Sequence, residues 1–119
     1  MGLTEQIVTV RPSRSARAHR EVERLVDSGA VYSLVPAPVL RGLGLRPYRT
    51  ETFTLADGTK VSRRVGDAYF EIGGNRGPAP VIFGEEGDEP LLGVTALESM
   101  GLVLDPFKRR LLPMRFLLA

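Results

Sequence analysis

Short apolar and β-branched runs, separated by clusters of turn-forming residues, predict a mostly-β domain. Apolar and polar positions alternate at residues 52–55 and 68–72, which is the period of a half-buried strand. Gly66 is expected to break or bulge the chain before the second of these segments. Many short strands with frequent turns are typical of a closed barrel or a sandwich. Strands are predicted at residues 3–10, 22–26, 50–55, 60–65, 68–72, 81–83, 91–93, 102–104 and 110–112.

One or two short helices interrupt the strands. A proline near its start and glycines just beyond it predict a helix over residues 36–43. Thr95 and Glu98 have the spacing of a capping box, which places a helix start at Thr95. Gly101 stands where that helix would end in a left-handed residue.

Composition describes one domain, residues 1–119, large enough to bury a core without crosslinks. The absence of cysteine excludes disulfides, thiol catalysis and cysteine-bound zinc. The single histidine, His19, excludes a multi-histidine metal centre, and the acidic segment 84–90 lacks the spacing of an EF-hand loop. No metal and no cofactor are therefore expected.

Charge and hydropathy limit the classes of partner that are expected. The formal net charge is only +2, and the basic segment 11–20 contains no aromatic residue, so an ordinary solvated loop is favoured over a nucleic-acid site. No apolar run approaches the roughly 20 residues of a membrane span, and the first residues lack the apolar stretch of a signal peptide. A cytoplasmic protein with neither nucleic acid nor membrane as partner is expected.

The most informative segment is residues 25–30, Leu-Val-Asp-Ser-Gly-Ala. Two apolar residues carry a strand into the interior and deliver Asp27. A buried carboxylate is costly unless it is hydrogen-bonded. Ser28 offers a hydroxyl, and Gly29 permits a tight turn that exposes its N–H to the carboxylate. Taken alone, the same triplet also fits an ordinary turn after a strand.

The order of motifs resembles that of the retropepsin-like family, the retroviral-type aspartic peptidases of clan AA. In that family Asp-Thr/Ser-Gly-Ala is followed by a flap hairpin and then by a strand of two hydrophobic residues and glycine leading into a helix. Here Leu91, Leu92 and Gly93 stand in that later position, and residues 93–97 resemble the family's Gly-x-x-x-Leu run. Ser33 matches a position that is Ser or Thr in many relatives. The resemblance covers residues 22–112 and is closer to bacterial and cellular members than to viral ones.

The resemblance implies a retropepsin-like closed β-barrel or sandwich and an aspartic endopeptidase acting on a peptide or protein substrate. Each chain supplies one catalytic carboxylate, Asp27, so a homodimer is implied in which the two share one proton and activate water. Ser28, Gly29, Ala30 and Ser33 would support the active-site loop, and the strand at residues 91–93 would pack against it. A non-catalytic peptide-binding or assembly module of the same fold is the alternative.

The flap expected from the resemblance is the hairpin at residues 54–61. Asp57-Gly58 is a strong signal for a tight turn, and closure of such a hairpin over substrate would exclude water. An ordinary surface hairpin has the same pattern. The residues predicted to line the substrate are Leu55, Ala56, Asp57, Gly58 and Thr59.

Two departures from the viral pattern concern the dimer interface. Viral members carry an acid two residues after the motif's glycine and an arginine just after the later glycine, and these two pair. Here the positions hold Val31 and Val94, which implies an apolar replacement. An apolar tail is expected at or near the interface, with a strand covering the protein's own core as the alternative. The tail comprises Met114, Phe116, Leu117 and Leu118.

Overall fold

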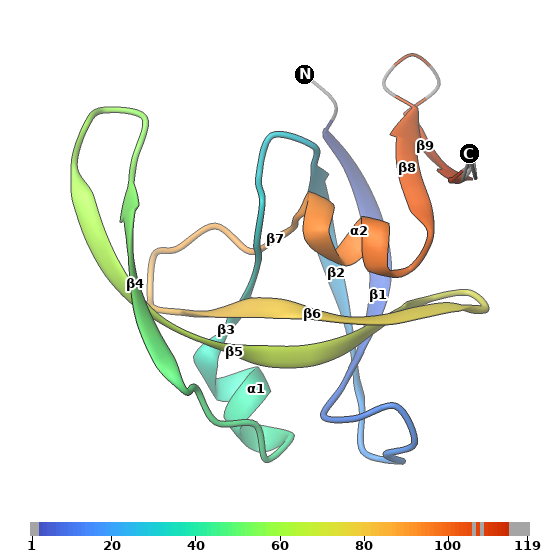
Figure 1. The fold of residues 1–119 in the computed structure, drawn as a ribbon, viewed down its shortest axis with the longest axis horizontal. Helices are drawn as coiled ribbons and strands as arrows, with labels where there is room; N and C mark the ends of the chain where they lie inside the picture. The colour runs from blue at the N-terminus through green and yellow to red at the C-terminus, as the bar shows by residue number, and fades with distance from the viewer. Residues whose placement is uncertain (1–2, 106, 108, 115–119) are drawn as a thin grey trace, which may run out of the picture.

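The computed structural model describes residues 3–105, 107 and 109–114, and these form a mostly-β fold with two short helices (Figure 1). The mostly-β prediction is confirmed. Phe116, Leu117 and Leu118 of the expected interface tail lie outside the described residues. The elements are β1 (Leu3–Arg11), β2 (Arg20–Asp27), β3 (Ser33–Pro36), α1 (Ala37–Gly42), β4 (Arg49–Thr54), β5 (Lys60–Ile72), β6 (Asn75–Gly84), β7 (Leu91–Leu92), α2 (Val94–Ser99), β8 (Leu102–Asp105) and β9 (Arg110–Pro113).

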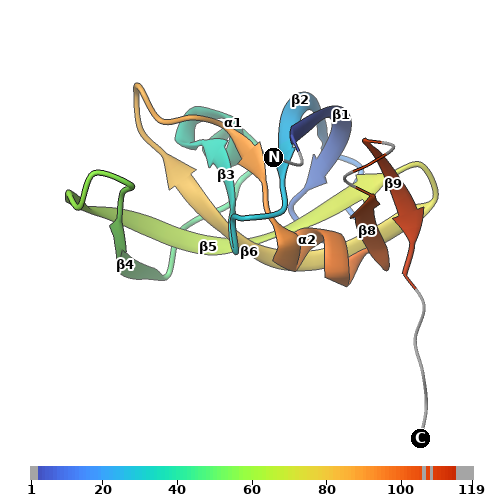
Figure 2. The same cartoon turned by 90° about the horizontal axis from the view of Figure 1, so that it is seen from above.

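Seven strands form one bent sheet in the order β1-β2-β7-β3-β6-β5-β4, and β8 and β9 form a separate hairpin. β1 also pairs with β5, but only through Thr9, Val10 and Arg11. The expected closed barrel is not formed, because β4 and the adjoining half of β5 extend beyond the rest of the sheet as a two-stranded arm (Figure 1). β5 and β6 cross on one side of β1, β2 and β3 (Figure 2).

The core lies where these strands cross. Successive side chains of a strand point to opposite faces, and this decides which of them enter the core. Val8 and Val10 of β1 are fully buried, whereas the preceding residue, Ile7, is 58% exposed. At about 25 cal/mol per Å² of buried apolar surface, this cluster is the main source of stability. Its largest fully buried side chains are Phe70, Leu40, Leu92, Leu97, Val8, Val10, Val26, Val35, Val65 and Val81.

Gly66 does not break the chain, and that expectation is wrong. β5 is continuous through residues 60–72 and keeps its register with β6 on both sides of the glycine. A Cβ at Gly66 would lie 3.0 Å from the carbonyl oxygen of Arg46 and 3.0 Å from Phe83 Cε1. The glycine therefore serves close approach of the α1–β4 loop to the strand, and not a bulge.

The capping box is also not formed. α2 begins at Val94, its N-cap is Gly93, and no side chain caps it. The Thr95 hydroxyl instead donates to the carbonyl oxygen of Val31, far away in the sequence. Gly101 does end the helix region with φ +73, as expected.

β3 was not predicted, because residues 33–36 are few and end in a proline. The strand forms because its neighbours supply pairing: it runs parallel to β6 and antiparallel to β7. Ser33 and Val35 are buried and the residues between them only partly so, which is the period-two pattern. β3 thereby becomes the central strand between the segment carrying Asp27 and the long β5–β6 pair.

Candidate functional site

Asp27 is the last residue of β2, where the chain turns sharply out of the sheet. The preceding Val26 is fully buried, so the strand is anchored immediately before the carboxylate. The Gly29 N–H donates to Asp27 Oδ1 at 2.9 Å, and the Ala30 N–H donates to the Asp27 carbonyl oxygen at 3.1 Å. The turn therefore orients one carboxylate oxygen and leaves the other available. Within the described part of the chain, Ser28 is exposed and its hydroxyl makes no hydrogen bond.

Several hydrogen bonds tie the segment after Asp27 to the start of α2. Gly93 N–H donates to Ser33 Oγ at 2.9 Å, and Ser33 is completely buried. Val94 N–H donates to the carbonyl oxygen of Ala30 at 2.8 Å. A buried hydroxyl needs a partner, and here its partner is the glycine of the later motif. The two motifs singled out from the sequence thus meet in space.

β7 runs directly beside the strand that delivers Asp27. It is parallel to β2, with Leu25 opposite Leu91 and Val26 opposite Leu92. A Cβ at Gly93 would lie 2.6 Å from the carbonyl carbon and oxygen of Tyr32, so only glycine fits between α2 and the loop. Leu91 and Leu92 therefore lie beside the end of β2, and Gly93 lies directly against the loop that follows it.

A hollow of about 780 Å³ opens over Asp27. Gly29 and Ala30 line it from the loop, and Leu55 and Ala56 line it from the β4–β5 hairpin. Asp57, Gly58 and Thr59, which the flap prediction included, form the tip of that hairpin but do not line the hollow. The remaining lining residues are Val31, Tyr32, Leu34, Phe53, Thr54, Val61, Arg63, Ile82, Asp88, Glu89 and Leu91.

The hairpin tip is a tight, internally bonded turn. Gly58 N–H donates to the Leu55 carbonyl oxygen at 2.9 Å, and Leu55 N–H donates to the Thr59 carbonyl oxygen at 2.7 Å. Hydrogen bonds from Thr59, including its N–H at 2.8 Å, lower the pKa of Asp57. Gly58 has φ +88, a conformation that favours glycine. The Asp-Gly signal in the sequence is explained by this geometry.

Sequence reasoning missed the contact that joins the hairpin to the Asp27 loop. Arg49 of β4 donates from Nη2 to the Tyr32 hydroxyl at 2.9 Å. Tyr32 also packs edge-on against Phe53, with ring centroids 6.2 Å apart. A lone tyrosine and arginine separated by 17 residues give no pattern in the sequence. Their contact fixes the base of the hairpin relative to the loop.

The acidic segment 84–90 is held to β5 by an ion pair. Asp88 accepts two hydrogen bonds from Arg63 of β5, at 2.7 and 2.8 Å, and a third from the Glu85 N–H at 2.7 Å. The hydrogen bonds from Arg63 are the main reason that the pKa of Asp88 is lowered below its ordinary value of 3.8. This ion pair closes one side of the hollow.

Asp88→Asn is expected to remove a pH-dependent part of the stability. Because the pKa of Asp88 is lower in the folded state, its contribution is complete above 3.8 and is lost as the pH falls through the lowered value. The variant should be about 1–2 kcal/mol less stable than the parent at neutral pH. Urea unfolding from about pH 7 to about pH 3 measures the difference, which should shrink at the acid end.

Glu86→Gln in the same loop is the matched control, since Glu86 is exposed. It should change the stability little at any pH. A difference between parent and Asp88→Asn that stays constant down to the acid end would contradict this account of the ion pair.

Comparison with protein-family models and with curated proteins finds no match. Among the described residues, no group of three or more His, Cys, Asp or Glu side chains is placed to hold a metal ion. No helix in the same residues is long and apolar enough to cross a membrane.

Proposed function

We propose that the protein is a homodimeric, retropepsin-like aspartic endopeptidase in which Asp27 of each subunit forms half of the catalytic site. The observation that carries the proposal is the position of Asp27. It ends β2 directly after the fully buried Val26, in a loop whose Ala30 carbonyl oxygen accepts a hydrogen bond from Val94 N–H of α2. It also lines a hollow shared with the β4–β5 hairpin. A rigid carboxylate at a peptide-sized hollow is what hydrolysis by this chemistry requires.

The chemistry needs two carboxylates. Two that lie close together cannot both ionise, so they share one proton. The ionised member takes a proton from water, whose oxygen attacks the peptide carbonyl carbon, while the protonated member donates to the carbonyl oxygen. The tetrahedral intermediate then breaks its C–N bond as the nitrogen receives a proton. Because each chain offers one Asp27, the second comes from a symmetry-related copy.

The surface around the loop supports pairing there. Ser28 and Gly29 are exposed, and Val31, an apolar residue, is 63% exposed. A twofold contact at this loop would bring the two Asp27 carboxylates together and cover Val31. Valine in place of the viral acid is compatible with an interface that excludes water.

The hollow supports an extended peptide with apolar side chains as substrate. Most of its lining is apolar, including Leu34, Phe53 and Ile82. Buried apolar contacts would hold the substrate side chains, and the hairpin would cover its backbone. Cleavage is therefore expected between apolar residues.

A peptide-library cleavage assay from acidic to neutral pH tests the proposal, with and without a statine-type transition-state analogue. We expect cleavage that the analogue inhibits. Peptides that bind without being cut, and no effect of the analogue on any turnover, would instead identify a peptide-binding module of the same fold.

Gly58→Val tests the role of the hairpin. The substitution strains a residue at φ +88, costing about 1–3 kcal/mol, and should displace the tip from its bonded turn. Cleavage should fall roughly 10–100-fold, as misplaced substrate-positioning groups do, while folding and dimerisation persist. Steady-state kinetics with sedimentation measures both.

Gly73→Val is the control, because Gly73 has φ +59 in the β5–β6 turn and does not line the hollow. It imposes similar strain without touching the hairpin. Equal activities in the two variants would show that the β4–β5 hairpin is not part of the substrate site.

A further inference from the structure

A second hollow, lined by three arginines, lies on the other face of the β5–β6 pair. Its lining consists of Arg41, Gly44, Leu45, Arg46, Pro47 and Arg64, and its volume is about 540 Å³. Arg63 and Arg64 are consecutive in β5, so their side chains point to opposite faces of the sheet. Arg63 lines the hollow at Asp27, whereas Arg64 lines this one. The two sites are therefore separate.

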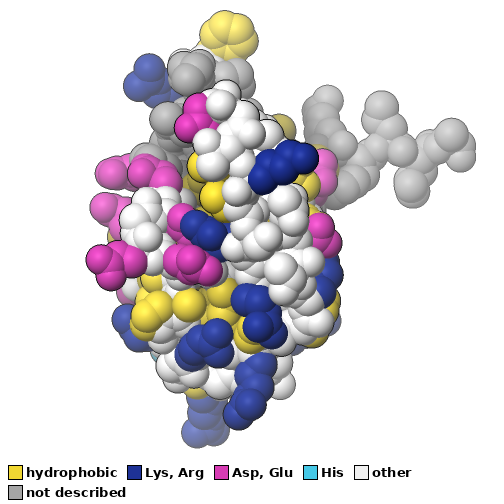
Figure 3. All heavy atoms as spheres, turned by 90° about the vertical axis from the view of Figure 1, so that its left-hand side faces the viewer, with side chains coloured by type: hydrophobic (Ala, Val, Ile, Leu, Met, Phe, Trp, Pro, Cys, Tyr) yellow, Lys and Arg dark blue, Asp and Glu magenta, His cyan; other side chains and the backbone are white. Residues whose placement is uncertain are grey.

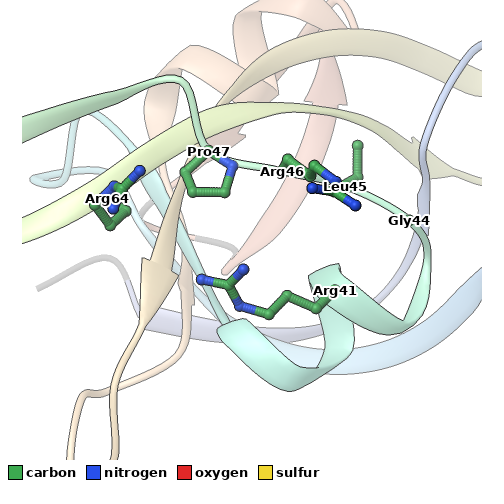
Figure 4. A pocket seen from close by; sticks show the side chains of 6 residues that line it. All are labelled: Arg41, Gly44, Leu45, Arg46, Pro47 and Arg64. Atoms are coloured by element: carbon green, nitrogen blue, oxygen red, sulfur yellow. The ribbon is translucent and has the colours of Figure 1, made fainter.

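The three arginines that line the hollow come from three segments of the chain. Arg41 belongs to α1, Arg46 to the loop that follows it, and Arg64 to β5. Figure 4 shows the Arg41 side chain extending from α1 toward Pro47 and Arg64. Its guanidinium stacks over the Phe83 ring, 5.5 Å from the centroid, and Phe83 is the direct cross-strand partner of Arg64. One buried aromatic ring is therefore the neighbour of both Arg41 and Arg64.

The charge of this hollow is uncompensated. No acidic residue lines it, and among the described residues none of its three arginines forms an ion pair. Figure 3 shows Lys and Arg side chains gathered low on the face that carries β4 and β5, apart from a group of acidic side chains above them. Elsewhere arginines do pair with carboxylates: Arg11, Arg49, Arg63 and Arg76. Like charges brought together in this way repel, and an anion would relieve that repulsion.

The walls of the hollow are fixed by backbone bonds. Gly44 N–H donates to the Arg41 carbonyl oxygen at 2.9 Å, and Leu45 N–H donates to the Leu40 carbonyl oxygen at 3.0 Å. Tyr48 N–H donates to the Val65 carbonyl oxygen at 2.9 Å, which holds the loop against β5. Because these bonds already order the loop, ligand binding need not include the entropic cost of ordering it.

We propose that this hollow binds the phosphate group of a small molecule. Guanidinium groups bind phosphate through paired N–H donors, and a phosphate carries more charge and more acceptor oxygens than a carboxylate, so it satisfies several arginines at once. The volume lies within the range of small-molecule sites and exceeds what one phosphate fills, which leaves room for a second group. The proposal stands independently of peptidase activity.

Pyrophosphate is the probe, titrated at constant ionic strength and followed by calorimetry and by backbone amide NMR. Saturable one-to-one binding is expected, with shifts at Gly44, Leu45 and Phe83. Arg41→Gln and Arg64→Gln should each weaken binding about tenfold or more, since each removes a charged hydrogen-bond donor. Arg41→Lys should weaken it less, because the charge remains without the paired donors.

Arg14→Gln is the matched control, an exposed arginine in the β1–β2 loop. It should leave pyrophosphate binding unchanged, and circular dichroism of all variants should match the parent because the altered side chains are exposed. Absence of saturable binding would overturn the proposal. So would an equal loss in Arg14→Gln, which indicates general charge attraction, or tighter binding of a short single-stranded oligonucleotide with shifts centred on residues 11–20.

Discussion

Asp27→Asn is expected to reduce peptide cleavage to background while the fold and the dimer persist. The asparagine side-chain oxygen can still accept the Gly29 N–H that Asp27 Oδ1 accepts at 2.9 Å, so the loop keeps its shape. What disappears is the group that both takes and gives a proton. General acid–base catalysis alone is worth roughly 10²–10⁴-fold, and this residue supplies both roles.

The dimer of this variant should form at least as well as the parent, because two crowded carboxylates are replaced by neutral groups. Asp67→Asn is the control. Asp67 is an exposed carboxylate of β5 that accepts a hydrogen bond from the Tyr48 hydroxyl and does not line the hollow. Its variant should retain parental kcat/KM.

Mixing experiments separate a shared site from independent sites. Heterodimers of the parent with Asp27→Asn should be inactive, so activity should fall faster than the fraction of parental chain. The parent should show a bell-shaped pH dependence that belongs to the carboxylate pair as a unit. A linear fall on mixing, with each parental chain keeping its full rate, would show that one chain suffices.

Gly93→Ala is expected to be the most damaging single methyl addition at the site. Gly93 has φ −93 and ψ 172, which alanine adopts readily, so the cost is steric. The new Cβ would lie 2.6 Å from the Tyr32 carbonyl group and 2.9 Å from the Val31 carbonyl oxygen. Backbone cannot rotate away as a side chain can, so α2 and the Asp27 loop must separate. Such overpacking costs about 1–3 kcal/mol.

The same separation stretches the bond from Gly93 N–H to Ser33 Oγ, which leaves a buried hydroxyl without its partner. Urea unfolding measures the loss of stability, and cleavage should fall with it. Gly42→Ala is the matched control: Gly42 ends α1 and has nothing within 4 Å of an added Cβ. The idea fails if Gly93→Ala proves as stable as Gly42→Ala.

The parts of the site that the sequence predicts are those governed by local chemistry. Asp57-Gly58 specifies its turn because Gly58 has positive φ, and Asp27 and Gly29 form their hydrogen bond two residues apart. Packing of residues 91–93 against the loop was expected only through a family resemblance, and the hydrogen bond between Gly93 and Ser33 was not predicted. Ser33 and Gly93 are 60 positions apart, and no local sequence pattern predicts a contact over that separation.

The parts that could not be predicted depend on the tertiary arrangement. Gly66 has the pattern of a strand breaker, yet its role is set by the carbonyl oxygen of Arg46, which approaches from another element. Thr95 has the sequence pattern of a helix cap, yet its hydroxyl donates to the carbonyl oxygen of Val31 in another segment. The pairing of Arg63 with Asp88 likewise depends on how the β6–β7 loop folds back over β5.

The long sequence separations at the Asp27 loop have a consequence for the order of folding. The β1–β2 and β5–β6 hairpins join neighbouring segments and close early, since short loops lose little chain entropy. The hydrogen bonds that tie the loop and β3 to the start of α2 join residues 60 to 64 positions apart and close late. During synthesis Asp27 emerges long before Gly93 and Thr95, so the nascent chain carries its carboxylate in an unformed loop. The loop therefore reaches its final shape only after α2 has left the ribosome.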